Sequence, residues 1–320
     1  MKNIKEGEGP ILENLSSIKI FLSGDVMLGR GIDQILPHPS DPRIYESAIK
    51  DAKDYIKLAE EVNGRIPQGV SSDYIWGDAI REWELKAPHF RVINLETSIT
   101  KANTPWLKGI NYRMHPDNIE ALTVANIDAC ILANNHILDW DTEGLSETLA
   151  SLNKAQIHYT GAGETIQQAQ TPAILSLPDM KGRILIFSFG TRSSGIPDAW
   201  RANKEHSGVW LLDQLNDESL QQVKTVVETY KQKDDLCIAS IHWGGNWGYL
   251  VSHEHQIFSH DLVDKAGINV VHGHSSHHPI GIEIYKNSPI LYGCGDFIND
   301  YEGIKGQEEY KDYLALMYFL

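Results

Sequence analysis

Side chains with metal-binding chemistry recur where short apolar runs of the sequence end. Five groups of this kind follow such runs: Asp25; Asn94 and Glu96; Asn134, Asn135 and His136; His242; and His272, His274, His277 and His278. Carboxylate, amide and imidazole groups without thiolates suit Mn²⁺, Fe²⁺, Co²⁺ or Zn²⁺. Such ions clamp a phosphoryl group and activate water, and a neighbouring histidine protonates a leaving oxygen. The residue types therefore predict a site for one or two divalent transition-metal ions.

The elements that must position these groups alternate between strands and helices. Apolar, β-branched runs predict strands over residues 18–23, 90–95, 129–133, 183–189, 236–241 and 268–271. Helical periodicity predicts helices over residues 41–61, 117–125, 142–155, 215–231 and 255–266. Segments 281–285 and 289–293 are typical of a hairpin, and 314–320 of a terminal strand, so the sheets of this α/β protein are expected to be mixed. Ligands of α/β sheets bind at the carboxyl ends of the strands, where all five polar groups fall.

Each of these residues also has an ordinary structural explanation. An aspartate after a glycine, such as Asp25, is typical of a turn or a helix N-terminus, and Asn134 and Asn135 are compatible with a turn. Glu96 is compatible with a surface ion pair, and His136 with a structural histidine. Structural roles explain the distribution of the histidines less well, because eight of the 14 histidines lie between residues 242 and 278. Three of these, His253, His255 and His260, lie on or before a predicted helix and are expected to be solvated or to contact the ligands without binding the metal themselves.

Charge restricts the class of partner. The chain has 320 residues, with 28 Lys and Arg against 43 Asp and Glu, and a net charge of −15. Phosphate backbones and anionic membranes need basic surface, so a general nucleic-acid or membrane binder is excluded. An enzyme for an acidic or phosphorylated small molecule or polymer is not excluded, because a bound metal supplies a local positive charge. The oligomeric state has no signal in the sequence.

The remaining features indicate one globular domain in a reducing compartment. The three cysteines, Cys130, Cys237 and Cys294, lie far apart in apolar runs and are expected to be buried thiols. There is no signal-peptide core and no apolar stretch long enough to span a membrane, so a cytoplasmic location is expected. Residues 1–16 are polar and are expected to form a flexible N-terminal segment, and 17–320 a single domain.

At these residues the sequence resembles the CapA/PgsA family of capsule and poly-γ-glutamate synthesis proteins, a branch of the calcineurin-like metallophosphoesterase superfamily. The matching stretches are residues 24–30 (GDVMLGR), 94–96 (NLE), 133–139 (ANNHILD), 161–163 (GAG), 242–244 (HWG), 273–277 (GHSSH), 282–285 (IEIY) and 289–298 (PILYGCGDFI). They follow the family's order. The resemblance implies a four-layer α/β/β/α sandwich with metal ligands on the loops after the strands.

The resemblance also implies roles for individual residues. It assigns metal ligation to Asp25, Glu96, Asn135, His242 and His274, and the general-acid or phosphate-contact role to His136. Arg30 follows Asp25 by five residues. Its guanidinium suits a bidentate contact to a substrate anion, and it equally suits a structural salt bridge.

The sequence departs from the superfamily and family patterns at several positions, which include the second motif (Asn94-Leu95-Glu96 for Gly-Asp) and Asn246 (often acidic in the family). Met27 stands where the first strand usually carries a second ligand, a histidine, which puts a full two-metal centre in question. The last motif offers His272, His274 and His277, of which the family spacing favours His274 and His277. Asp296 stands where the family often has asparagine and adds a carboxylate, although a helix N-cap or turn role is the default for such a residue. Further candidate ligands are Asn94, Asn134, His272 and Asp296.

The sequence and the resemblance are compatible with two functions, one of an enzyme and one of a non-catalytic protein. The first is a metal-dependent hydrolase acting on a phosphoester or on a γ-glutamyl or acidic polymer. The second is a non-catalytic accessory or binding component of polymer synthesis with a degenerate metal site, which Met27 favours. A nucleotide-binding α/β protein is disfavoured because no glycine-rich phosphate loop follows the first strand. Trp247 and Tyr249 are candidates for a cavity wall, whereas Trp140 and Trp243 are expected in the core.

Overall fold

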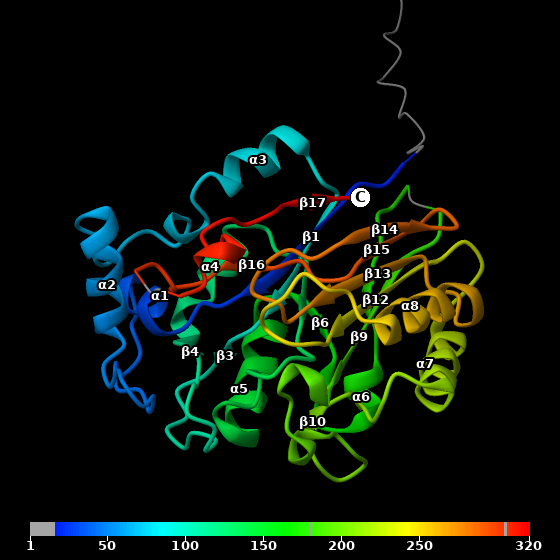
Figure 1. The fold of residues 1–320 in the computed structure, drawn as a ribbon, viewed down its shortest axis with the longest axis horizontal. Coiled ribbons are helices and arrows are strands. Elements are labelled where there is room, and N and C mark those ends of the chain that lie inside the picture. The colour runs from blue at the N-terminus through cyan, green and yellow to red at the C-terminus, as the bar shows by residue number, and fades with distance from the viewer. Residues whose placement is uncertain (1–16, 180, 304–305) are drawn as a thin grey trace, which may run out of the picture.

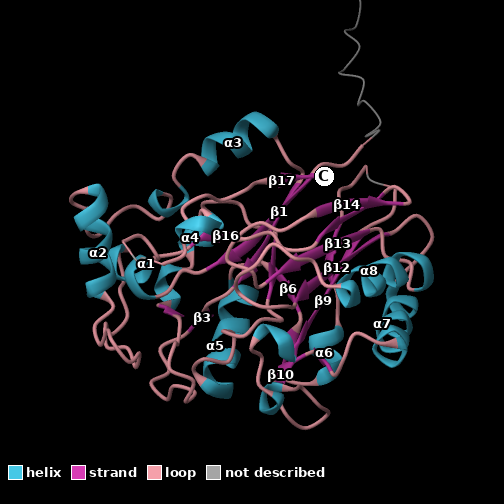
Figure 2. Cartoon of the chain, viewed as in Figure 1, coloured by secondary structure: helices cyan, strands magenta, loops and turns pink. Residues whose placement is uncertain are grey.

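Two β-sheets stack face to face, and helices cover the outer face of each, as Figures 1 and 2 show. The computed structural model describes residues 17–179, 181–303 and 306–320. The predicted flexible segment 1–16 lies outside the described residues. The prediction of a single domain over 17–320 stays a prediction.

The first sheet is mainly parallel. Its strands, in spatial order, are β16 (Asp296–Ile298), β1 (Ile20–Val26), β2 (Phe90–Leu95), β5 (Ala129–Ile131) and β6 (His158–Thr160), and β17 (Tyr318–Phe319) pairs antiparallel with β1. The second sheet is mixed. Its strands are β11 (Leu211–Leu212), β9 (Ile184–Thr191), β12 (Leu236–His242), β13 (Val270–His274), β15 (Ser288–Leu291) and β14 (Ile282–Tyr285), with β8 (Ala173–Leu175) against β9.

The helices and the short strands complete the fold. The helices are α1 (Arg30–Ile35), α2 (Lys53–Asn63), α3 (Ala79–Lys86), α4 (Glu120–Thr123), α5 (Asp141–Lys154), α6 (Ile166–Gln170), α7 (Asp217–Tyr230) and α8 (His253–Lys265). The short 3₁₀ helices are η1 (Tyr74–Trp76), η2 (Pro116–Asn118), η3 (Arg192–Ser194), η4 (Asp198–Trp200) and η5 (Glu308–Tyr310). The two-stranded pairs are β3 (Ser98–Ile99) with β4 (Arg113–Met114), and β7 (Ala162–Gly163) with β10 (Gly208–Val209).

Three apolar layers separate the four structural layers. Between the sheets, Leu22 of β1 packs in the same cluster as Ile186 of β9 and Ile238 of β12. Phe21, the neighbour of Leu22, belongs instead to the cluster under the helices of the first sheet. Alternate residues of a strand point to opposite faces, so strands covered on both faces are apolar throughout. The third cluster packs α7 and α8 on the second sheet. This order confirms the predicted α/β/β/α sandwich.

Most predicted elements are present near their expected positions, and β2 covers residues 90–95 as predicted. The hairpin of β14 and β15 is also confirmed. Lys286 and Asn287 form its turn with φ angles of 48° and 69°, the left-handed values that a two-residue type I′ turn requires. The three cysteines are buried and free.

The predicted helix over 41–61 is wrong in its first half. The α2 helix begins only at Lys53, and residues 43–51 form a loop closed by a bridge between Arg43 and Asp51. The loop turns the carboxylate of Glu46 inward, where it accepts hydrogen bonds from Arg30 and Tyr55. A buried ionic contact thus outweighs local helix propensity, which is a weak determinant.

Candidate metal centre

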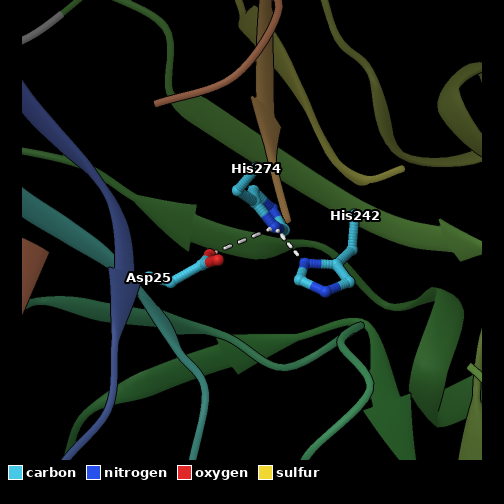
Figure 3. A group of neighbouring side chains, drawn as sticks. All are labelled: Asp25, His242 and His274. Carbon is cyan, nitrogen blue, oxygen red and sulfur yellow. Dashed lines mark hydrogen bonds and ion pairs between the residues drawn. The ribbon is translucent and has the colours of Figure 1, made fainter. Parts of the chain in front are cut away.

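The polar groups predicted at strand ends do converge at one edge of the stacked sheets. Asp25 is the last but one residue of β1, while His242 and His274 end the neighbouring strands β12 and β13 in register with each other. Figure 3 shows the three side chains pointing at a common point from both sheets. Parallel strands bring their carboxyl ends to one edge, which explains why residues so far apart in sequence meet here.

The first cluster consists of Asp25, His242 and His274, whose ligand atoms all lie within 4.8 Å of one another. The two Nδ1 atoms of His242 and His274 are 2.7 Å apart, and Nδ1 of His274 is 3.9 Å from Oδ1 of Asp25. All three side chains are buried. Two imidazoles and one carboxylate form a donor set that Zn²⁺, Fe²⁺ and related ions accept.

A second cluster shares Asp25 with the first. Asp25, His277 and Asp296 also bring ligand atoms within 4.8 Å of one another. The Nδ1–H group of His277 donates to Oδ1 of Asp296 over 2.9 Å. His277 rather than His272 therefore lies beside the carboxylates. Ser275, between His274 and His277, has a φ of 106°, a strained value for a residue other than glycine, and this turn separates the two histidines.

His272 is close to the first cluster but both its nitrogens are engaged. Its Nε2–H donates to the carbonyl of Ser23 over 2.8 Å, and its Nδ1 is 3.0 Å from Oγ of Ser240. With Nε2 protonated, Nδ1 accepts the Ser240 hydroxyl proton. Oγ of Ser240 then accepts from Nε2–H of His274, 2.9 Å away. The lone pair of His274 is therefore on Nδ1, facing Asp25 and His242. His272 and Ser240 set the tautomer of a candidate ligand, as outer groups of metal sites do.

Replacing Ser240 by alanine tests this relay. Ser240→Ala removes the acceptor for Nε2–H of His274 and leaves the ring free to change tautomer. We expect the affinity of the first cluster for Zn²⁺ to fall about 10–100-fold, the usual cost of losing such a partner. Competition with a fluorescent zinc chelator measures it. Ser146→Ala, in a pair with Glu164 on the surface, serves as control. Unchanged affinity in Ser240→Ala would show that the relay does not matter.

The two asparagines Asn94 and Asn134 support the centre rather than enter it. Nδ2 of Asn94 donates to Oδ1 of Asp25 over 2.6 Å, and Nδ2 of Asn134 donates to Oδ1 of Asn94 over 3.1 Å. The other predicted ligands lie nearby. Oδ1 of Asn135 is 3.0 Å from Nε2 of His242, and Oε1 of Glu96 is 3.8 Å from the same atom.

His136 lies beside this centre with a fixed orientation. Its Nδ1–H donates to Oδ2 of Asp139 over 2.6 Å, and its ring stacks on Tyr112 with 3.9 Å between ring centroids. Lys108 pairs with the other oxygen of Asp139 at 2.7 Å. Nε2 of His136 is 4.0 Å from Glu96. The contact to Asp139 leaves Nε2 as the atom available for proton transfer.

Arg30 lies in a buried ionic network. Its guanidinium donates to Asp300, to Oε1 of Glu46 at 3.0 Å and to the hydroxyl of Tyr55 at 2.8 Å. It also lies over the Tyr55 ring, 3.8 Å from the centroid. These contacts are those of the structural salt bridge considered above. Its predicted contact to a substrate anion stays a prediction.

A cavity of about 520 Å³ opens beside the centre. Its lining includes Arg30, Lys108, Asn135, His136 and His277, and Trp247 forms part of its wall. Tyr249, the other predicted wall residue, is not among the residues that line the cavity; it is more than half exposed and packs on His278. Trp140 and Trp243 are buried in the core as expected. The volume is in the range of small-molecule sites.

Burial and like charges shift the pKa values in this centre. Burial, reinforced by the charge of Asp296, raises the pKa of Asp25 to about 7. Burial and the charge of Asp25 also raise the pKa of Glu96. Burial lowers the pKa values of His242 and His274, and lowers the pKa of His136 to about 4. Burial opposes protonation of His277 too, but the Asp296 carboxylate outweighs it and raises the pKa.

The residues fit a divalent cation. Oδ2 of Asp25 is buried and has no hydrogen-bond partner among the described residues, which is costly for a carboxylate oxygen. Neutral imidazoles and adjacent carboxylates face one another, and a cation between them would relieve the repulsion among the carboxylates.

The sequence did not single out Lys108, Asp139, Tyr112 or Ser240. Asp139 carried a signal, because it lies three residues after His136 within a stretch shared with the family. Lys108 and Tyr112 come from a loop whose sequence shows no periodicity. Ser240 is inside a strand, where a single serine resembles an ordinary core residue.

The stacked α/β/β/α layers are those of a metallophosphoesterase-like fold. Residues 19–301 match the family described as bacterial capsule synthesis protein PGA_cap, so the chain belongs to this family and the resemblance is confirmed.

Individual relatives agree with the family. The chain is 46% identical over 307 residues to a probable polyglutamine synthesis accessory protein of Mycobacterium tuberculosis, covering 95% of this chain and 80% of that protein. It is 24% identical to the capsule biosynthesis protein CapA of Bacillus anthracis, covering 95% of this chain and 64% of that protein. It is 23% identical to the PGA biosynthesis protein CapA of Bacillus subtilis, covering 87% and 62%. Throughout the described part of the chain, no helix is long and apolar enough to cross a membrane.

Proposed function

We propose that this protein is a metal-dependent hydrolase whose first cation site consists of Asp25, His242 and His274. The observation that carries the proposal is a buried cluster of one carboxylate and two imidazoles beside a cavity, in which one oxygen of Asp25 has no hydrogen-bond partner among the described residues. Glu96 and Asn135 lie at the same edge and are further ligands in this proposal. Mn²⁺, Fe²⁺, Co²⁺ and Zn²⁺ all suit the donors.

The chemistry divides between a cation and the side chains around it. A bound cation would supply Lewis-acid chemistry, activating water and neutralising charge on the substrate. His136 moves the proton. Its Nε2 is unprotonated in the substrate-free protein, and an anionic substrate beside it raises its pKa. Nε2 then takes up a proton and donates it to the leaving oxygen or nitrogen, while Asp139 stabilises the imidazolium.

The proposed substrate is a phosphoester or a γ-glutamyl bond in an acidic polymer. The names of the relatives, which refer to capsule, PGA and polyglutamine synthesis, support a polymer of the glutamate kind. Two basic residues, Lys108 and Arg30, line the cavity beside two acidic ones, Glu46 and Asp312, and a cation in the centre would add the positive charge that favours an anionic substrate. The cytoplasmic location stays a prediction.

Metal content tests the proposal first. Untagged protein is analysed for bound metal after exposure to Mn²⁺ or Zn²⁺, beside His274→Ala and the control His260→Ala. His260 is on α8 and bonds to Glu283, away from the centre. We expect metal in the wild type and the control only. Phosphodiesters, phosphomonoesters and γ-glutamyl peptides are then screened for hydrolysis. Absence of metal after reconstitution would contradict the proposal.

Asp139→Asn tests the proton-transfer role of His136. The amide cannot stabilise an imidazolium as a carboxylate does, so kcat is expected to fall about 10²–10⁴-fold. Metal content should not change, because Asp139 contacts His136 and Lys108 rather than the donors. The kcat of metal-loaded Asp139→Asn is compared with that of Asp141→Asn, two positions further along the chain at the start of α5. Equal kcat values in the two variants would exclude the role.

A second candidate function is a non-catalytic accessory component of polymer synthesis. Two observations favour it: Met27 supplies no ligand, since its buried sulfur accepts a hydrogen bond from the backbone of Gly29, and one relative is named an accessory protein. The hydrolysis screen distinguishes the two candidate functions. An accessory protein would hydrolyse none of the screened bonds even with its metal content restored.

A further inference from the structure

Asp296 lies directly against Asp25, although 271 positions separate them in the sequence. β16 pairs parallel with β1, and the register places Asp25 opposite Asp296. Gly24 and Gly295 allow the close approach, because a Cβ atom on Gly24 would overlap the backbone carbonyl of Gly295. Two carboxylates are thereby held side by side, and both are more than nine-tenths buried.

The surroundings of this carboxylate pair are built rather than incidental. Nδ2 of Asn299 donates to Oδ2 of Asp296 over 2.8 Å, and His277 donates to Oδ1. The His277 ring packs against Tyr301 and Trp247, with centroid distances of 5.4 Å and 5.3 Å. The backbone N–H of His277 donates to the carbonyl of Asn246. Its imidazole is therefore fixed beside the carboxylates.

Two like charges in a buried position require a positive group between them. His277 and Asn299 donate to Asp296, and Asn94 donates to Oδ1 of Asp25. These contacts leave Oδ2 of Asp25, which is buried, without a hydrogen-bond partner among the described residues. This unpartnered oxygen indicates that one more positively charged group belongs at this position.

We infer that Asp25, His277 and Asp296 form a second cation site, rich in oxygen donors, in which Asp296 supplies the ligand that Met27 lacks. The inference rests on the proposed function, since Asp25 is shared with its first cation site. The two sites differ in chemistry. The first offers two imidazoles and one carboxylate, and suits Zn²⁺ or Fe²⁺. The second offers two carboxylates and one imidazole, and suits harder ions such as Mn²⁺ or Mg²⁺.

Sequential loading tests the inference without any assay of activity. Metal-free protein receives one equivalent of Zn²⁺ and is then titrated with Mn²⁺, and the free Mn²⁺ is measured by its electron paramagnetic resonance signal. Wild type is compared with Asp296→Asn, His274→Ala and the exposed control Asp264→Asn, whose carboxylate bonds to Lys286 on the surface. Elemental analysis gives the total of each metal. Asparagine has the shape of aspartate, so the fold is expected to survive.

We expect wild type and Asp264→Asn to hold one Zn²⁺ and one Mn²⁺ per chain. Asp296→Asn should keep Zn²⁺ and lose about 100-fold or more in Mn²⁺ affinity, because even an outer partner of a ligand is worth about 10–100-fold. His274→Ala should lose Zn²⁺ affinity instead. A single ion in the wild type, or unchanged Mn²⁺ binding by Asp296→Asn, would overturn the inference and leave a one-metal hydrolase intact. Failure to bind either ion would overturn both proposals.

Discussion

Asparagine at position 25 is expected to abolish metal binding, because Asp25 contributes to both clusters. Asn94 still finds an acceptor in the amide oxygen, so the side chain stays in place while the negative charge is lost. We expect less than a tenth of the wild-type metal content in Asp25→Asn, measured by elemental analysis after dialysis. Asp264→Asn is the exposed control. Metal retained by Asp25→Asn at the wild-type level would contradict both metal assignments.

The same substitution should stabilise the metal-free protein at high pH. Burial and Asp296 raise the pKa of Asp25 from 3.8 to about 7 in the folded state. Between these values the folded protein binds more protons than the unfolded chain, so the free energy of unfolding falls as the pH rises. The amide in Asp25→Asn does not titrate in this range. Above pH 7 the metal-free variant is therefore expected to exceed wild type by a few kcal/mol, at about 1.4 kcal/mol per pKa unit.

Urea unfolding in a chelator, from pH 4 to pH 8, measures this difference. The gap between Asp25→Asn and wild type should open between about pH 4 and pH 7 and then level off. With saturating Mn²⁺ or Zn²⁺ the wild type should become the more stable of the two, because only the folded wild type gains binding free energy from the metal. If the free energies of unfolding of wild type and Asp25→Asn change in parallel with pH, the surroundings do not destabilise the charged form of Asp25.

Arg30→Met is expected to destabilise the protein by about 3–5 kcal/mol, as breaking a buried ion pair does. The Arg30 side chain is 3% exposed, and its partners Glu46 and Asp300 are 10% and 6% exposed. Methionine fills a similar space but leaves two buried carboxylates without a cationic partner. Arg43→Met, which breaks an ion pair on the surface, should leave stability essentially unchanged.

Urea unfolding measures both variants. If Arg30→Met does not fold, the triple variant that adds Glu46→Gln and Asp300→Asn keeps the prediction testable. Neutral partners remove the penalty of unpaired charge, so the triple variant should recover much of the lost stability. A single variant as stable as wild type would mean that the network contributes little to folding.

Local patterns predicted the parts of the fold that depend on neighbouring residues. The apolar runs of β1, β2 and β12 indicated their strands, and the polar residues after them indicated the edge where Asp25 and His242 meet. The hairpin of β14 and β15 was likewise visible in the turn residues Lys286 and Asn287.

Other features depend on distant residues and left no local trace. Asp296 has the sequence context of a turn residue, and its place beside Asp25 follows only from the pairing of β16 with β1. Asp300, 270 positions away in the sequence, binds the guanidinium of Arg30, and no local pattern indicated this partner. The loop that replaces the first half of the helix predicted over 41–61 exists because Glu46 joins the same network. The termini of predicted elements moved for the same reason, since tertiary contacts decide where a strand or helix ends.

The position of β1 has a consequence for how the protein is made. One edge of β1 pairs with β2, and the other pairs with β16 and β17, which are formed by residues 296–298 and 318–319. A nascent chain emerging from the ribosome thus exposes the Asp25 strand long before its last neighbours are synthesised. Such long-range pairing is slow and exposes strand edges to aggregation. The candidate metal centre is therefore completed only after residues 296–298 have been made and have paired with β1, which brings Asp296 to Asp25.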